Sequence, residues 1–161
     1  MDKPKLTIEL VPSTCWFSNV RSEVPPKEWD RLRKECYKNA DYKCEVCQGS
    51  GREQGYKHPV ECHEIWHYDD ENKIQTLGGL IALCPRCHQV KHIGRTTIIG
   101  RQAEAFAQME KVNNWTHKEV VNYVANAFME HNWRSQFEWS LNIGVLTEVY
   151  GVDKSLIKGE R

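Results

Sequence analysis

The sequence predicts a single α+β domain spanning residues 1–161, with a central core at residues 40–95 and flanking elements at 1–39 and 96–150. Three observations support this class. Two Cys-x-x-Cys pairs bracket the middle of the chain, apolar residues alternate with polar ones in several short segments, and apolar residues recur at helical spacing in others.

The N-terminal flank is predicted to be a strand followed by a helix. Residues 5–11, KLTIELV, alternate apolar and polar side chains with the two-residue period of a half-buried strand. Pro25 and Pro26 then open a helical pattern that places Leu32 and Cys36 on one apolar face. We therefore expect Cys36 to be a core residue.

The central core is predicted to be two strands followed by a helix. A glycine-rich loop at 49–59 precedes a strand at 60–67, and the acidic turn YDDE leads to a second strand at 78–83. Pro85 is placed to start a helix that continues through His92.

The C-terminal flank is predicted to contain two amphipathic helices and a strand. The helices are expected at 101–113 and 117–131, and the second opens with a capping box from Thr116 to Glu119. Residues 137–143 alternate like a strand, which we expect to pair antiparallel with residues 5–11 and close the domain.

Charge and hydropathy exclude several classes of protein. The net charge is zero, which argues against coating nucleic acid by bulk attraction, although Lys and Arg outnumber acids in 21–43 and 84–111. No apolar run is long enough to span a membrane. The N-terminus lacks the pattern of a signal peptide, so the expected location is the cytoplasm.

Four cysteines predict a structural zinc site. Cys44, Cys47, Cys84 and Cys87 form two Cys-x-x-Cys pairs, which supply the four thiolates of a closed tetrahedral zinc. The interval between the pairs is 36 residues, longer than the roughly 15 to 20 of a plain zinc ribbon. The zinc would therefore clamp the two ends of an inserted hairpin.

A second group of ligands lies near that zinc. His88 and His92 are four residues apart and share one face of the predicted helix. A strand carrying Cys62 and His63 could add a third ligand and a free base. The alternative is that these histidines are surface residues or cap the zinc loops.

In these residues the chain resembles the HNH, or ββα-metal, nucleases. The matching segments are CEVC at 44–47, VECHEI at 60–65 and LIALCPRCHQVKH at 80–92. The resemblance implies a ββα-metal core and an endonuclease, with His63 as the general base that activates water. It further implies that Cys62, His88 and His92 hold a second divalent metal, Zn²⁺ or Mg²⁺/Mn²⁺.

Two departures from the family pattern leave an alternative open. Gly79 stands where the family's central asparagine is expected, and Gln75 or Asn72 would have to replace it. Cys62 is a soft ligand that favours zinc over magnesium. The alternative is a zinc-stabilised module that binds nucleic acid or protein on an inactive scaffold.

The expected substrate is DNA rather than RNA. Arg86, Lys91, Arg95 and Arg101 lie on and after the predicted metal helix and are candidates for phosphate contacts. The flanking helices leave room for a homodimer interface or an accessory protein subunit. The sequence specifies neither the strandedness of the substrate nor the pathway.

Overall fold

The computed structural model describes residues 3–159, and it confirms the α+β class. No described helix has the length and apolar character needed to cross a membrane. The elements within this range are, in order, η1 (Ser13–Cys15), α1 (Val20–Glu23), α2 (Pro26–Asn39), η2 (Gly51–Gln54), β1 (Glu61–Asp69), β2 (Ile74–Leu83), α3 (Pro85–Lys91), α4 (Ile93–Ile98), α5 (Gln102–Asn113), α6 (His117–Arg134), β3 (Ser140–Asn142), α7 (Val145–Glu148) and η3 (Lys154–Leu156).

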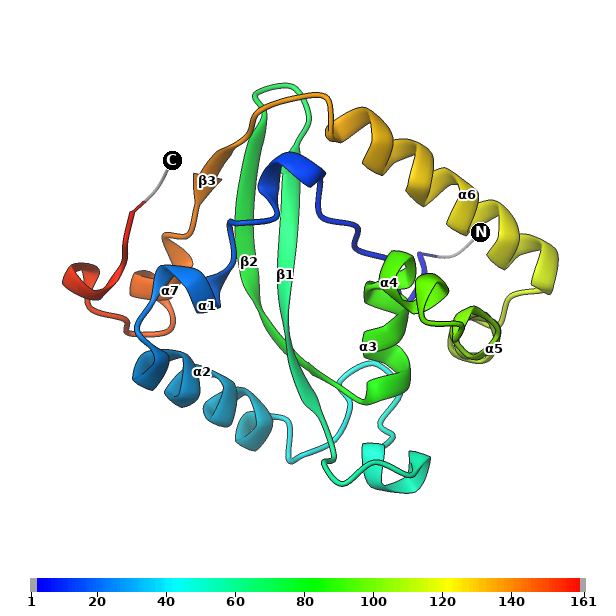
Figure 1. The fold of residues 1–161 in the computed structure, drawn as a ribbon. Helices are drawn as coiled ribbons and strands as arrows, with labels where there is room; N and C mark the ends of the chain where they lie inside the picture. The colour runs from blue at the N-terminus through cyan, green and yellow to red at the C-terminus, as the bar shows by residue number, and fades with distance from the viewer. Residues whose placement is uncertain (1–2, 160–161) are drawn as a thin grey trace.

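A long hairpin of β1 and β2 forms the centre of the molecule (Figure 1). The two strands are antiparallel, with His63 opposite Ile81, and the register shifts between Ile65 and Trp66. The short strand β3 pairs in parallel with β2, so the order is β1-β2-β3 and β1 lies at an edge of the sheet. One edge of β1 is therefore not paired with another described strand.

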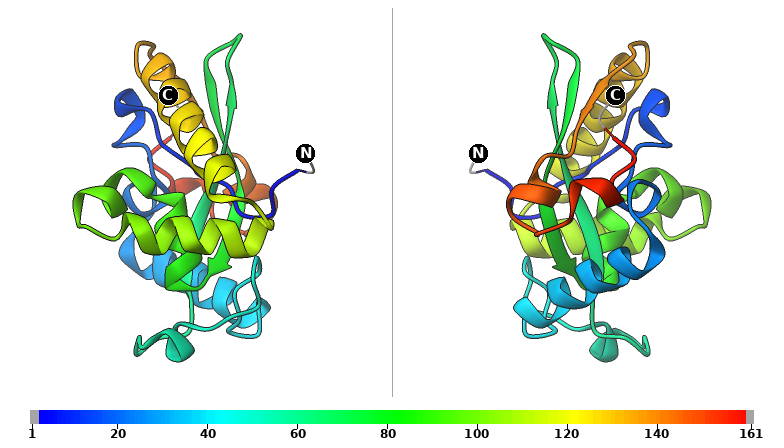
Figure 2. Two further views of the ribbon diagram at one scale, coloured as in Figure 1. Left: turned by 90° about the vertical axis from the view of Figure 1, so that its right-hand side faces the viewer. Right: turned by 90° about the vertical axis from the view of Figure 1, so that its left-hand side faces the viewer.

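Helices cover the hairpin on both sides. Helices α3, α4, α5 and α6 lie on one side of it, whereas α1, α2 and α7 lie on the other (Figure 1). The hairpin tip and η2 lie at opposite ends of the molecule (Figure 2). Each side has its own apolar cluster, one around Leu83, Val90 and Ile93 and one around Leu32, Trp66 and Leu77.

The predicted pairing of the two terminal strands is wrong. Residues 7–12 form neither helix nor strand, and β3 pairs with β2 instead. The N-terminal segment packs on helices, where Leu6 is fully buried and its amide donates to Asn113 Oδ1 at 2.9 Å. The amide of Glu9 donates to the Lys91 carbonyl at 3.2 Å. The alternating apolar residues of this segment do form one buried face, but that face packs against helices and not against a strand.

The predicted helices are present at α2, α3, α5 and α6. Leu32 and Cys36 are buried on α2, as the apolar pattern predicts. Thr116 and Glu119 form the complete capping box of α6. The sequence did not predict α4, which follows α3 directly and continues the chain from the predicted metal helix into α5.

Candidate metal and active site

The four cysteines of the two Cys-x-x-Cys pairs converge at one end of the hairpin. Their sulfur atoms all lie within 4.8 Å of one another, and Cys47 Sγ is 3.6 Å from Cys84 Sγ. The amide of Gly49 donates to Cys47 Sγ at 3.4 Å, and Gln108 Nε2 donates to Cys87 Sγ at 3.2 Å. Four free cysteines at this spacing, with donors directed at the sulfurs, are compatible with a structural zinc site.

The first cysteine loop is fixed to the base of β2. The amide of Glu45 donates to the Ala82 carbonyl at 2.9 Å, and the amide of Ala82 donates to Glu45 Oε2 at 2.7 Å. Gln48 takes the left-handed conformation that lets the chain turn back around Cys44, with φ of 62°. The loop and the start of α3 therefore present their cysteines to the same point.

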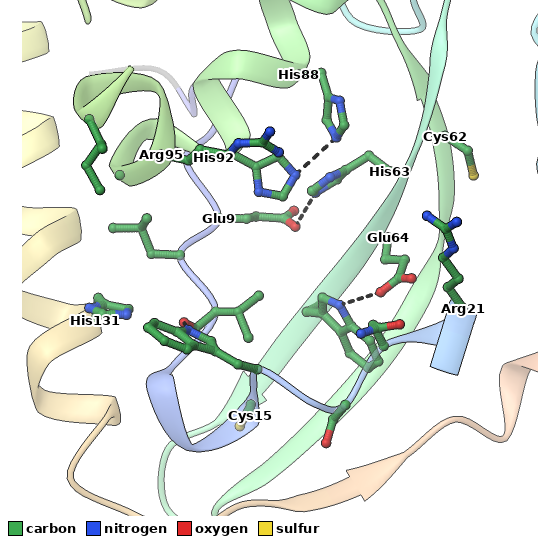
Figure 3. Close-up of a pocket in the computed structure, with 18 of the residues that line it drawn as sticks. Glu9, Cys15, Arg21, Cys62, His63, Glu64, His88, His92, Arg95 and His131 are labelled. Carbon is green, nitrogen blue, oxygen red and sulfur yellow. Dashed lines mark hydrogen bonds and ion pairs between the residues drawn. The ribbon is translucent and has the colours of Figure 1, made fainter. Parts of the chain in front are cut away.

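Three histidines form a second cluster beside the four cysteines. His63 comes from β1, whereas His88 and His92 come from α3 and its C-terminal cap. One ring nitrogen of each lies within 4.8 Å of the others, and the Nε2 atoms of His88 and His92 are 3.1 Å apart. Figure 3 shows the three rings directed toward one another across the gap between β1 and α3.

Two carboxylates orient the imidazoles. Glu61 Oε2 accepts a hydrogen bond from His88 Nδ1, and Glu9 Oε2 lies 2.7 Å from His63 Nε2. The hydrogen bond from His88 lowers the pKa of Glu61, so this carboxylate is ionised and accepts. With its Nδ1 donating, His88 directs the Nε2 lone pair toward His92, as in the carboxylate–histidine–metal arrangement of known metal sites.

The local environment disfavours protonation of His63 and His92. Burial lowers the pKa of His63, although Glu9 opposes this effect. Desolvation in the cleft and the neighbouring His88 and His63 also lower the pKa of His92, although its side chain is exposed. Burial works to raise the pKa of Glu9, but His63 and Lys91 outweigh it and hold that pKa below its usual value. Neutral imidazoles keep the lone pairs that a metal ligand or a base requires.

The structure corrects the placement of Cys62. Neighbouring side chains in a strand point to opposite faces, so Cys62 and His63 cannot both face α3. Cys62 instead packs in a small cluster with Cys36, Val60 and Ala82. The hydrogen bond with the Cys36 thiol and, to a smaller extent, burial raise the pKa of Cys62. Figure 3 shows its sulfur directed away from the histidines. The cluster of potential ligands is therefore His63, His88 and His92.

The structure also explains why Gly79 is not asparagine. Its φ is +153°, a conformation that residues with side chains rarely adopt, and an added Cβ would lie 3.1 Å from Tyr150 Oη. That hydroxyl accepts a hydrogen bond from the Leu80 amide at 2.8 Å. Gln75 and Asn72 bond to Tyr68 and Asp69 near the hairpin tip, so the structure does not bring them to His63.

The predicted phosphate-binding residues are not equivalent. Lys91 is buried, and its Nζ donates to Thr7 Oγ1 at 2.7 Å and lies 3.6 Å from Glu9 Oε1. This position corrects its assignment to a phosphate-binding surface. Arg86 lies 3.7 Å from Glu104, and Arg101 donates to Tyr56 Oη at 2.7 Å. Arg95 alone of the four lines the cleft beside the histidines.

This cleft has a volume of about 840 Å³ and follows the free edge of β1. One part of its lining is the histidine cluster with Glu9. The N-terminal segment and α1 supply another, which includes Trp16, Asn19 and Arg21. A substrate in the cleft would therefore contact residues of both the core and the N-terminal flank.

Sequence reasoning missed both carboxylates that orient the histidines. Glu61 stands two residues before His63, so the two-residue period of the strand could have placed both side chains on the face toward α3. Glu9 offers no such signal because 54 positions separate it from His63. Comparison with protein-family profiles, curated proteins and solved structures gives no match for this chain.

Proposed function

We propose that the protein is a metal-dependent endonuclease with a ββα-metal core, and that it hydrolyses phosphodiester bonds of DNA. The observation that carries the proposal is the convergence of His63, His88 and His92, with Glu61 bound to one imidazole and Glu9 to another. A purely structural role would not need two half-buried carboxylates that orient imidazoles at the rim of an open cleft.

His88 and His92 are the residues that would hold the second divalent ion. Their Nε2 atoms face one another at 3.1 Å, and a pair of imidazole donors suits zinc better than magnesium or manganese. When bound, such an ion stabilises the charge that develops on a scissile phosphate. His88 is held in one tautomer by Glu61, so the residues are oriented before any ion arrives.

His63 is assigned as the general base. Glu9 accepts the Nε2 proton of His63, which leaves the Nδ1 lone pair to take a proton from water. As His63 becomes protonated, the adjacent carboxylate stabilises the imidazolium, and Lys91 keeps that carboxylate in position through its own contact with it. Glu9, which belongs to the N-terminal flank and not to residues 40–95, thus orients the base. In the family pattern an asparagine has this role.

The test is cleavage by purified protein with added zinc, magnesium or manganese, on plasmid and on single-stranded DNA. We expect His63→Ala to reduce the cleavage rate by at least about a hundredfold. The matched control is His67→Ala, which removes an exposed histidine from the same strand and should cut at the wild-type rate. Equal rates for His63→Ala and wild type would show that His63 is wrongly assigned.

A second candidate function is a zinc-stabilised binding module without catalysis. The observation in its favour is Gly79, whose backbone conformation disfavours the asparagine of the family pattern. Absence of cleavage under all metals, together with tight binding of DNA, would favour this module. The metal content per chain distinguishes the cysteine site from the histidine cluster. His88→Ala should bind one metal ion fewer than wild type, whereas Cys62→Ser should bind as many as wild type.

A further inference from the structure

An exposed tryptophan is fixed at the wall of the cleft. Trp16 lines the cleft with 63% of its surface exposed, and its Nε1 donates to the Val11 carbonyl at 3.1 Å. The preceding turn, η1, is held to the body of the protein because Cys15 is buried and Thr14 Oγ1 donates to the Phe137 carbonyl at 2.7 Å. The indole is therefore an ordered aromatic surface that the fold does not cover.

Two arginines give the same cleft a positive charge. Arg21 on α1 and Arg95 on α4 both line it and are exposed. Neither guanidinium has a hydrogen bond or ion pair with any described residue. Figure 3 shows them at opposite sides of the cleft, with His63 between them. Both are free to contact phosphate groups on either side of a bond held at the histidines.

The carboxylates of the lining do not cancel this charge. Glu9 is engaged by His63 and Lys91. Glu64 accepts hydrogen bonds from the Val20 amide at 3.0 Å and from Trp66 Nε1 at 3.2 Å. Lys91 is a cationic neighbour of Glu9, and burial raises the pKa of Glu64 to about 7, which weakens its negative charge at neutral pH. The exposed, unpaired charges that face a ligand are therefore those of the arginines.

The remaining lining is largely apolar. Leu10, Val11, Ile98 and Phe128 offer nothing to a phosphate or a sugar hydroxyl. In a duplex the faces of the bases are stacked and hidden, so a paired substrate would leave this surface and the Trp16 indole uncovered. An unpaired strand presents phosphates and base faces in alternation, and base stacking on an aromatic side chain contributes about 1–3 kcal/mol.

We propose that this cleft binds an unpaired DNA strand, with one base stacked on Trp16 and the flanking phosphates contacted by Arg21 and Arg95. The inference rests on the proposed nuclease function and specifies the form of its substrate. A single-stranded region, a flap or a locally opened duplex would meet this requirement, whereas a fully paired helix would not.

The test compares binding of labelled 12-nucleotide single-stranded DNA and the matching duplex by fluorescence anisotropy, without added metal. We expect the single strand to bind about tenfold more tightly than the duplex. Trp16→Leu keeps apolar volume but removes the aromatic face, so it should weaken single-strand binding by about tenfold and leave duplex binding unchanged. Trp16→Phe retains an aromatic face and should stay within about threefold of wild type.

The matched control is Trp133→Leu, which replaces a tryptophan of 42% exposure on α6, outside the cleft. It should bind like wild type. The inference is overturned if the duplex binds as tightly as the single strand. It is also overturned if folded Trp16→Leu binds the single strand like wild type, or if Trp133→Leu loses as much single-strand affinity as Trp16→Leu. Tighter binding of RNA of the same sequence would overturn the assignment to DNA.

Failure of this inference differs from failure of the nuclease proposal. Cleavage that depends on His63 but prefers duplex DNA would refute the unpaired-strand inference and support the nuclease. Single-strand binding that depends on Trp16, without cleavage under zinc, magnesium or manganese, would refute the nuclease and support the strand-binding surface. Cleavage tests the nuclease proposal and fluorescence anisotropy tests the unpaired-strand inference, so the failure of one is distinguishable from the failure of the other.

Discussion

Replacement of Glu61 by glutamine tests whether the histidine cluster is a metal site. The Glu61 carboxylate accepts from His88 Nδ1 and also lies 2.8 Å from His58 Nε2. In Glu61→Gln the amide oxygen can still accept one hydrogen bond, so the packing of β1 against α3 is retained. What is lost is the negative charge that fixes the tautomer of His88 and increases its basicity as a ligand.

The expected loss of affinity follows from the hydrogen bond that changes. A hydrogen bond to a charged group contributes about 1.5–3 kcal/mol, and charge assistance makes it roughly twice as strong as a neutral one. The change from carboxylate to amide should therefore cost about 1–1.5 kcal/mol, or about a tenfold loss of metal affinity. Outer-sphere substitutions at known sites cost about 10- to 100-fold, which agrees with this range.

The assay is calorimetric titration of zinc and manganese into protein that retains the cysteine-bound zinc, with metal content checked by elemental analysis. The matched control is Glu110→Gln. Glu110 Oε1 lies 2.8 Å from His117 Nδ1, so it forms a carboxylate–histidine pair of the same kind, but outside the cluster. We expect the control to bind metal like wild type.

Two results would refute the reasoning. If Glu61→Gln bound the second ion as tightly as wild type, the carboxylate would not orient a metal ligand. If wild type bound no second ion at all, the His63, His88 and His92 cluster would be a hydrogen-bonded network, and catalysis through His88 and His92 would have to be abandoned.

Three further predictions address the zinc site, the glycine and the ion pair at the hairpin tip. Cys87→Ser should lose one zinc and the cooperative unfolding transition seen by circular dichroism, because structural zinc contributes about 10 kcal/mol to folding, whereas Cys62→Ser should keep its metal content. Gly79→Asn should lower the free energy of unfolding in urea by about 1–3 kcal/mol, since φ is +153° there; equal stability would contradict the strain argument. The hydrogen bonds from Arg134 hold the pKa of Asp70 below its usual 3.8, so the pair stabilises the fold above that pH and this contribution disappears as the pH falls through the lowered pKa. Asp70→Asn should therefore cost about 1 kcal/mol at neutral pH and progressively less as the pH falls below 3.8, a difference measurable by urea unfolding at each pH.

The parts of the fold that the sequence predicted are those fixed by local chemistry. Cys84 and Cys87 have the Cys-x-x-Cys spacing that presents two thiolates to one metal, and His88 and His92 share a helix face because of helical geometry. The capping box at Thr116 is another such local signal. In each case the residues that interact lie within one or two turns of one another.

The parts that failed depend on contacts between distant segments. The alternation of residues 5–11 could not reveal that helices, not a strand, cover Leu6. Glu9 could not be linked to His63, because nothing in either segment specifies the other. The error at Cys62 is different, since strand alternation alone excludes Cys62 and His63 from one face.

The four cysteines and the three histidines are connected structurally through the start of α3. Cys84 is the N-cap of this helix, Cys87 is its third residue, and His88 follows directly. Glu45, beside Cys44, is bonded to the base of β2, and β2 pairs with the strand that carries Glu61 and His63. A zinc held by the four cysteines would therefore fix both elements that carry the histidines. Loss of that zinc should weaken metal binding at the histidine cluster even though no cysteine belongs to it. Substitution of His88 or His92 should leave the cysteine site intact. This asymmetry distinguishes a structural clamp from a pair of independent metal sites.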